Sequence, residues 1–363
     1  MTENRILRFK LLHPYFNNCS MIKPLTSLRF FFAFFVFLSH LTMNFGSKKI
    51  DWIQRNFFYE GFLGVSFFFI LSGFVLTYST SKYISHDKTY NLDIRKFYLT
   101  RIFRIYPLHI LTLIITVAIY SDFKFSSFIA AFFLVHSFIP DFAYYFGYDS
   151  PSWSISDEMF FYSVFPFLVP IFIRKTKVVL ITVVLLSVIL IIIKPFIPLN
   201  YQKFIYYINP LSRLLDFYLG IMLYFAYNKI KSHINIRLGN ILEWTSLSLF
   251  ILFFLGHFWI DKAFRYSIFY WIPMCYIILA FSFQKGWLSK ILKHKILVYL
   301  GEISFAFYLV HLIVRSLYLR FNLPINIYIT PFLWLLLSLL LSAILFEFFE
   351  KPVNRFLKKK FIK

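Results

Sequence analysis

Long apolar runs without charge constrain the fold of this chain more than any other feature. Val178–Ile193 holds sixteen residues with neither a charge nor a proline, and Phe332–Phe346 is similar. A run of about 20 apolar residues suits a helix that crosses a bilayer, because lipid offers an open backbone no hydrogen-bond partner. The alternation of apolar and polar residues that a membrane β-barrel needs is absent. The sequence therefore predicts an all-α integral membrane protein.

The composition agrees with this class and excludes a soluble domain. Of the 363 residues, 60% are hydrophobic and 15% are charged, whereas a soluble domain carries about 25% charged residues. The net charge of +22 does not indicate nucleic-acid binding, because the lysines and arginines lie between apolar runs rather than on one polar face. Cys19 and Cys275 give neither a disulfide framework nor a metal-binding spacing.

Eleven apolar segments follow one another along the chain. They cover residues 24–45, 58–78, 97–120, 125–140, 155–173, 178–196, 210–227, 241–259, 265–283, 298–319 and 330–349. We expect about ten transmembrane helices, with 125–140 as a short, re-entrant segment. With both termini cytoplasmic, 26 lysines and arginines then lie inside, nine outside and three within spans, in agreement with the positive-inside rule. A full crossing by 125–140 would instead place the basic cluster at 174–177 outside.

The segments form one predicted membrane domain, residues 24–350. A cytoplasmic N-terminal segment, 1–23, precedes it, and a basic cytoplasmic tail, 351–363, follows it. The N-terminal segment lacks the apolar stretch and small-residue cleavage site of a signal peptide. No internal repeat is visible.

Charged and titratable residues inside apolar helices are costly in lipid and indicate a functional site. Arg29 and His40 are eleven residues apart in the first predicted helix. At 100° per residue this lies within about 20° of three full turns, so both project from one face, about 16 Å apart along the axis. The pair suits a charged ligand that docks at one end and delivers a group inward. The alternative is a snorkelling arginine and a hydrogen-bonded packing histidine.

Further polar residues stand at the ends of later spans. Arg101 and Arg104 are three residues apart, so one helix face presents two guanidinium groups that suit phosphate; an ordinary cytoplasmic anchor is the alternative. Glu158 stands where a later span enters the membrane from the outer side. Its expected roles are a catalytic acid or base, or a favourable charge at a helix N-terminus. Glu302 and His311 are expected as polar contacts between helices.

Together these motifs resemble the membrane acyltransferase 3 family over nearly the whole chain. The matching motifs, in order, are Arg29 with His40; Gly64–Phe74; Arg101–Pro107; Trp153–Pro166; Arg213 with Phe217 and Gly220; Gly301, Ser304, Tyr308 and His311; and Glu350–Pro352. Ser66 stands where many members carry an acidic residue, so we expect no acid role there. No extracellular esterase-like domain is expected, so transfer would be completed within the membrane domain.

The resemblance implies an O-acyltransferase of the bacterial inner membrane. It would move an acyl group, usually acetyl, from cytoplasmic acyl-coenzyme A to a hydroxyl of a surface or exported carbohydrate, without a metal. Arg29, Arg101 and Arg104 would hold the phosphates of acetyl-coenzyme A. His40 would accept the acyl group or act as general base, and Glu158 would activate the acceptor from a position nearer the outer face. The residues expected to bind the acceptor are Arg213, Trp153, Tyr162 and His311, although Arg213 could instead pair with Asp216.

A transporter or flippase of a lipid-linked sugar is the main alternative, since intramembrane charges also mark substrate paths. It predicts inverted repeats or paired broken helices, and the sequence shows neither. A structural scaffold would not need His40 and Glu158 in costly positions. Coenzyme-A-dependent chemistry distinguishes an acyltransferase from both alternatives.

Overall fold

The computed structural model describes residues 21–41, 45–85, 87–119, 123–321 and 326–362. Apart from residues 21–23, the predicted N-terminal segment lies outside the described residues, as does Cys19. Within the described part of the chain the structure is helical, with one isolated β-bridge between Ile84 and Tyr90. The predicted all-α class is confirmed.

The helices follow the predicted apolar segments closely. They are α2 (Lys23–Ser39), α3 (Lys48–Asn56), α4 (Leu63–Thr80), α5 (Ile94–Ile119), α6 (Phe125–Phe132), α7 (Phe142–Tyr145), α8 (Trp153–Ile193), α9 (Leu199–Lys203), α10 (Pro210–Ile230), α11 (Ile236–Gly256), α12 (Lys262–Arg265), α13 (Trp271–Ser282), α14 (Trp287–Leu292), α15 (Lys295–Phe321), α16 (Thr330–Leu345) and α17 (Lys351–Phe361). Two π-helical segments, Phe204–Ile208 and Phe346–Glu350, precede α10 and α17.

Six helical stretches among the described residues have the length and apolarity to cross a membrane, so the predicted count of ten is not confirmed. They are Lys48–Tyr83, Ile94–Ile119, Ser150–Phe196, Ile236–Trp259, Lys295–Phe321 and Thr330–Phe361. Two predicted spans are shorter helices, since α2 has 17 residues and α13 has 12. The eight residues of α6 extend only about 12 Å.

Helix α8 joins two of the predicted spans into one element. Its 41 residues would extend about 62 Å, roughly twice the hydrocarbon thickness of a bilayer. The helix is broken at Lys175, which has non-helical backbone angles, φ −129° and ψ 42°. The break falls within the basic cluster at 174–177 that separates the two predicted spans.

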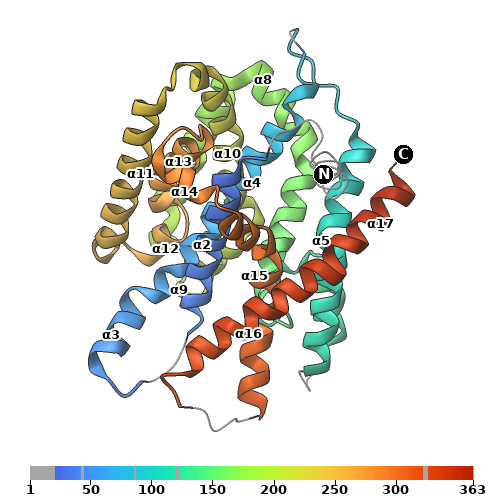
Figure 1. The fold of residues 1–363 in the computed structure, drawn as a ribbon, viewed down its shortest axis with the longest axis vertical. Coiled ribbons are helices and arrows are strands. Elements are labelled where there is room, and N and C mark those ends of the chain that lie inside the picture. The colour runs from blue at the N-terminus through green and yellow to red at the C-terminus, as the bar shows by residue number, and fades with distance from the viewer. Residues whose placement is uncertain (1–20, 42–44, 86, 120–122, 322–325, 363) are drawn as a thin grey trace, which may run out of the picture.

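The centre of the molecule is a group of closely packed helices (Figure 1). Helix α4 packs against α10 and α2, and α2 packs against α15. Helices α11, α13 and α14 lie on one side of this group, and α5 with α17 lies on the other (Figure 1). Two extensive clusters of buried apolar side chains fill the interior. The long apolar helices thus bury a shared core, although α8 and α11 keep many apolar side chains exposed, as expected next to lipid.

Two glycines allow α4 and α10 to approach closely. A Cβ atom on Gly73 would collide with the carbonyl oxygen of Phe217, and one on Gly220 would collide with that of Ile70. Small residues at helix contacts are the usual means of close packing in membranes, where no hydrophobic force drives helices together. This contact fixes α4, which supplies part of the cavity described below.

We expect Gly220→Val to destabilise the fold, because its side chain would meet backbone atoms of α4 that cannot rotate away. Overpacking typically costs about 1–3 kcal/mol, and contact with backbone should place this variant at the upper end. Thermal unfolding of detergent-purified protein measures the effect. Gly256→Val is the matched control, because no atom lies within 4 Å of the position of its Cβ. Equal melting temperatures for the two variants would contradict the account of the contact.

Candidate active site

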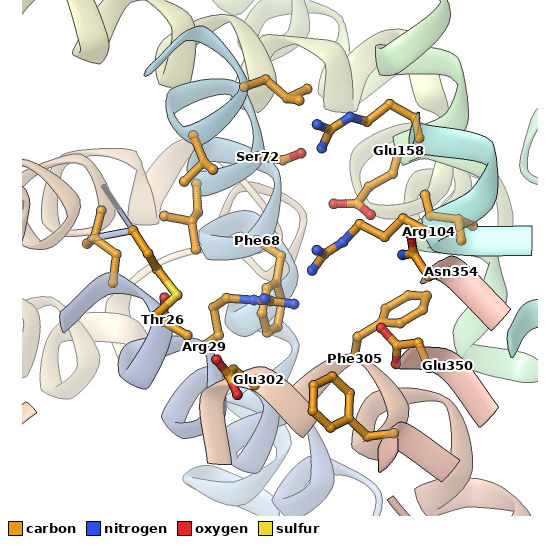
Figure 2. A pocket seen from close by; sticks show the side chains of 18 of the residues that line it. Thr26, Arg29, Phe68, Ser72, Arg104, Glu158, Glu302, Phe305, Glu350 and Asn354 are labelled. Atoms are coloured by element: carbon orange, nitrogen blue, oxygen red, sulfur yellow. The ribbon is translucent and has the colours of Figure 1, made fainter. Parts of the chain in front are cut away.

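A cavity of ≈ 360 Å³ lies between α2, α4, α5, α8, α15 and α17 (Figure 2). Apolar residues from α2, α4 and α15 form part of its wall, and charged residues converge on it from five helices. The charged and polar residues that line it are Thr26, Arg29, Ser72, Arg101, Arg104, Glu158, Tyr162, Glu302, Glu350, Lys351, Asn354, Arg355 and Lys358.

The cavity carries an excess of positive charge. Six cationic and three acidic side chains line it, a formal net charge of +3. Isolated charges in a low-dielectric site are costly unless they are paired or bind an oppositely charged ligand. The arrangement therefore suits an anionic ligand with more than one negative charge.

The three arginines predicted to bind phosphate all reach this cavity. Arg29 lies six residues from the start of α2, about 9 Å along the axis. Arg101 and Arg104 lie seven and ten residues from the start of α5, about 10 and 15 Å along it. The side chains of Arg29 and Arg104 point into the same space from opposite walls (Figure 2). The structure thus joins two motifs that are more than 70 residues apart in the sequence.

Glu158 lies in the same cavity, which differs from the predicted position nearer the outer face. Glu158 is half-buried, and its carboxylate interacts electrostatically with Arg29 and Arg104. Figure 2 shows it directed towards the arginine side chains. The prediction treated Glu158 and the arginine motifs as separate, whereas the packing of α8 beside α4 and α5 brings them to one cavity. Glu158 therefore offsets part of the arginine charge.

Tyr162, one turn after Glu158, completes this wall. Its hydroxyl accepts a hydrogen bond from the Ser72 hydroxyl at 3.3 Å. The Arg101 guanidinium lies over the Tyr162 ring, 6.0 Å from its centroid, and over the Phe97 ring at 5.7 Å. Tyr162 was predicted to bind the acceptor. It instead lines the same cavity as Arg29, Arg101 and Arg104, which we call the arginine cavity.

His40 and His311 form a separate pair at the other end of α2. His40 Nδ1 lies 2.9 Å from the carbonyl oxygen of Val36, and His311 Nδ1 lies 3.3 Å from that of Phe307. A carbonyl only accepts, so in the neutral rings both Nδ1 atoms carry the proton. The single Nδ1–H of His40 is then shared between the Val36 carbonyl and His311 Nε2, which lies 3.2 Å from His40 Nδ1. His40 Nε2 is left with the lone pair that nucleophilic or base chemistry needs.

Two further predicted residues lie outside the arginine cavity. Trp153, the first residue of α8, is buried and packs on Tyr207, with ring centroids 4.6 Å apart. The Tyr308 hydroxyl lies 2.8 Å from that of Ser154, the second residue of α8, and the Tyr308 ring is 6.0 Å from that of His311. These contacts connect the start of α8 to the histidine pair.

Arg213 forms the ion pair that the sequence left as its alternative role. The side chain is fully buried, with Nη1 3.5 Å from an Asp216 carboxylate oxygen. Nη1 also donates to the Tyr266 carbonyl at 2.6 Å, and Nη2 donates to the Ser66 hydroxyl at 3.0 Å. Because its terminal nitrogens are engaged by the protein, Arg213 fastens α10 to α4 and to the segment before α13.

Sequence reasoning missed the contribution of α17. The segment predicted as a basic tail is a helix, and Lys351, Asn354, Arg355 and Lys358 line the cavity. Their spacing of three and four residues was the available signal, because it places them on one helix face. Glu302, predicted as a polar contact between helices, also lines the cavity. Among the described residues, no group of three or more histidine, cysteine or carboxylate side chains is placed to hold a metal ion.

The fold and cavity define a helical membrane protein with a positively charged cavity inside its helix bundle. Residues 23–348 match the profile of the family described as acyltransferase domain. The chain therefore belongs to the acyltransferase 3 family, as its motifs predicted.

Several curated proteins resemble the chain over part of their length. Acyltransferase MdmB of Streptomyces mycarofaciens is 33% identical over 40% of this chain and 38% of its own length. O-acetyltransferase OatA of Staphylococcus aureus is 27% identical over 81% of this chain and 53% of its own. A putative O-acetyltransferase of S. aureus strain COL is 26% identical over 84% and 54%. The chain thus spans about half or less of the length of these relatives. No solved structure matches the chain significantly.

We expect Arg213→Leu to destabilise the protein strongly, because it leaves the Asp216 carboxylate buried and uncompensated. Removing one partner of a buried pair costs about 3–5 kcal/mol. Lys194→Ala is the comparison, since Lys194 forms a partly exposed ion pair with Asp261 of a kind worth about 0–1 kcal/mol. Thermal unfolding in detergent should show a much larger decrease for Arg213→Leu. A stable Arg213→Leu protein with impaired activity would instead favour an acceptor-binding role.

Proposed function

We propose that the protein is a membrane O-acyltransferase that moves an acyl group, most simply acetyl, from acyl-coenzyme A to a carbohydrate hydroxyl. The observation that carries the proposal is the cavity that collects Arg29, Arg101 and Arg104. Guanidinium groups bind phosphate bidentately, and the diphosphate of coenzyme A supplies the charge that the cavity needs. Family membership and relatives named as O-acetyltransferases support the same reaction.

The distance between the arginine cavity and His40 favours coenzyme A as the donor. The two sites lie at opposite ends of α2, about 16 Å apart along its axis. In acyl-coenzyme A the thioester lies at the end of a long pantetheine arm, far from the phosphates. We propose that the arginines hold the phosphates while the arm extends along α2 and brings the thioester to His40.

His40 Nε2 is the proposed reactive atom. As general base it takes the proton of the acceptor hydroxyl while the hydroxyl oxygen attacks the thioester carbonyl; the C–S bond breaks and the thiolate leaves. The thiolate then takes the proton from the imidazolium, so the products are the ester and free coenzyme A. The covalent alternative uses the same atom, which first carries the acyl group and then passes it to the hydroxyl. Both routes consume the same two substrates and yield the same products, the ester and free coenzyme A.

The acceptor is proposed to enter at the histidine end of α2. There His311 contacts the His40 ring, Tyr308 lies beside His311, and Ser154 and Trp153 follow at the start of α8. Aromatic and hydroxyl side chains suit a carbohydrate, which offers both apolar faces and hydroxyl groups. Glu158 is proposed to position the donor arginines rather than to activate the acceptor, because it lies within the arginine cavity.

The proposed orientation follows from the distribution of charge. With both termini cytoplasmic in the bacterial inner membrane, 26 basic residues lie inside and nine outside. The donor would then bind from the cytoplasm, and the acceptor would meet His40 from the other side. The acceptor would therefore be a surface or exported carbohydrate.

Release of free coenzyme A from acetyl-coenzyme A by detergent-purified protein, with cell-envelope glycan added, tests the function. We expect His40→Ala to lose at least about 100-fold in rate, the contribution of one acid–base group, while retaining affinity for coenzyme A. His294→Ala is the matched control, because His294 is exposed in the turn between α14 and α15. Absence of release by folded native protein with any acyl donor would overturn the proposal.

A further inference from the structure

We propose that the Phe68 side chain of α4 closes the arginine cavity towards His40 and restricts the acyl groups that pass to small ones. The inference rests on the proposed function and names a specificity-determining residue of the same site. A donor held by the arginines must carry its thioester and acyl group past this ring to reach His40. An acetyl group displaces the ring little, whereas a bulky acyl group is held back.

The arginine cavity ends short of the histidine pair, and α15 shows where. Glu302 and Phe305 of this helix line the cavity. Tyr308 and His311 follow at intervals of three residues, about 4.5 Å each along the axis. Neither of these two, nor His40, is among the described residues that line the cavity. The end of the cavity therefore lies between Phe305 and Tyr308.

Phe68 occupies this end of the cavity. It is one of the residues that line the space (Figure 2), and its ring meets the Tyr308 ring edge-on, with centroids 6.2 Å apart. The Tyr308 ring is in turn 6.0 Å from that of His311, which lies 5.1 Å from the His40 ring. A continuous row of rings thus leads from the cavity to the reactive histidine, and Phe68 is its first member.

The course of α4 directs the Phe68 ring towards the histidine end of α2. A Cβ atom on Gly61, just before α4, would meet the carbonyl oxygen of Phe35. A Cβ atom on Gly64, three residues later, would meet that of Phe32. Helix α4 therefore runs antiparallel to α2, with its own N-terminus nearer the histidine pair. Because helical side chains tilt towards the N-terminus of their helix, the Phe68 ring leans from the cavity towards His40.

Phe68 borders free space, unlike the aromatic residues around it. Phe67 and Phe69 are 0% and 1% exposed, and Phe307 is 0% exposed, whereas Phe68 is half-buried. An enclosed ring moves only if its packed neighbours also move, but a ring at the edge of a cavity can change rotamer into the open space. The Phe68 ring can therefore yield to the narrow pantetheine arm and an acetyl group, and less readily to a wide acyl group.

Release of free coenzyme A from acetyl-coenzyme A and from benzoyl-coenzyme A tests the inference, with detergent-purified full chain and added cell-envelope glycan. We expect native protein to act faster on the acetyl donor. Phe68→Ala should reduce the ratio of the acetyl to the benzoyl rate at least about 10-fold, as apolar space for a few carbon atoms provides. Phe68→Leu should reduce the ratio in the same direction and guards against a folding defect in the smaller variant. Affinity for coenzyme A should not change, because the arginines hold the phosphates.

Val75→Ala is the matched control. Val75 also lines the cavity, and its position seven residues after Phe68 places it on the same face of α4, about 10 Å farther from the histidine end. This variant should keep the native ratio of the two rates.

Native protein that releases coenzyme A equally fast from both donors would overturn the inference, as would Phe68→Ala and Phe68→Leu variants that keep the native ratio. Loss of affinity for coenzyme A in both variants would also contradict it, because that result would place Phe68 at the phosphates rather than on the path to His40. In these cases the acyltransferase stands, since native protein still turns over the donor. If native protein releases no coenzyme A from either donor, the proposed function fails, and the inference fails with it.

Discussion

The rest of the structure depends on three half-buried arginines that lie among apolar helices. Arg29, Arg101 and Arg104 come from two helices, and each would be costly in a low-dielectric interior without compensation. Glu158 and Glu350 supply part of that compensation from α8 and from the segment before α17. The positive charge that remains suits the cavity to an anionic ligand. The close packing of α4, α10, α2 and α15 keeps these side chains in one place.

In the proposed function, donor binding and chemistry are separated along a single helix, α2. The arginine cavity is near the start of α2, and His40 follows the last residue of that helix. The His40 ring is oriented by a backbone carbonyl and by His311 of α15, the helix that also contributes Glu302 to the cavity. Because α2 and α15 pack against each other, the two sites are held at a fixed separation. A donor with a long arm between its anionic and reactive ends fits that separation.

Much of the fold was predictable from the sequence, because lipid imposes a strong rule on apolar segments. Each predicted segment corresponds to a described helix, including the short helix α6 within 125–140. The number of spans was not predictable in the same way. Helix α8 continues through two segments with only a break at Lys175, and α10 carries Arg213 and Asp216 within a helix too polar to resemble a span. Pairing between Arg213 and Asp216 makes these polar residues tolerable inside the protein; the sequence offered this pair as an alternative but could not decide it.

The sequence predicted many of the individual residues of the candidate site, but it did not predict which of them share one cavity. The motif around Glu158 gives its residue type and helix, but its position beside Arg29 depends on contacts between α8, α4 and α2. Likewise the spacing of Lys351, Arg355 and Lys358 indicates a basic helix face, yet only the packing of α17 on α5 turns that face into the cavity. Contacts between residues distant in the chain therefore decided both findings.

The most direct test of the central claim is an experimental structure of the full chain in a lipid nanodisc with coenzyme A bound. We predict that the diphosphate lies in the cavity of Figure 2, within about 2.7–2.9 Å of guanidinium nitrogens of Arg29, Arg101 or Arg104, with the pantetheine arm directed along α2 towards His40. A nucleotide bound at the histidine end of α2, or elsewhere with the arginine cavity empty, would contradict the account.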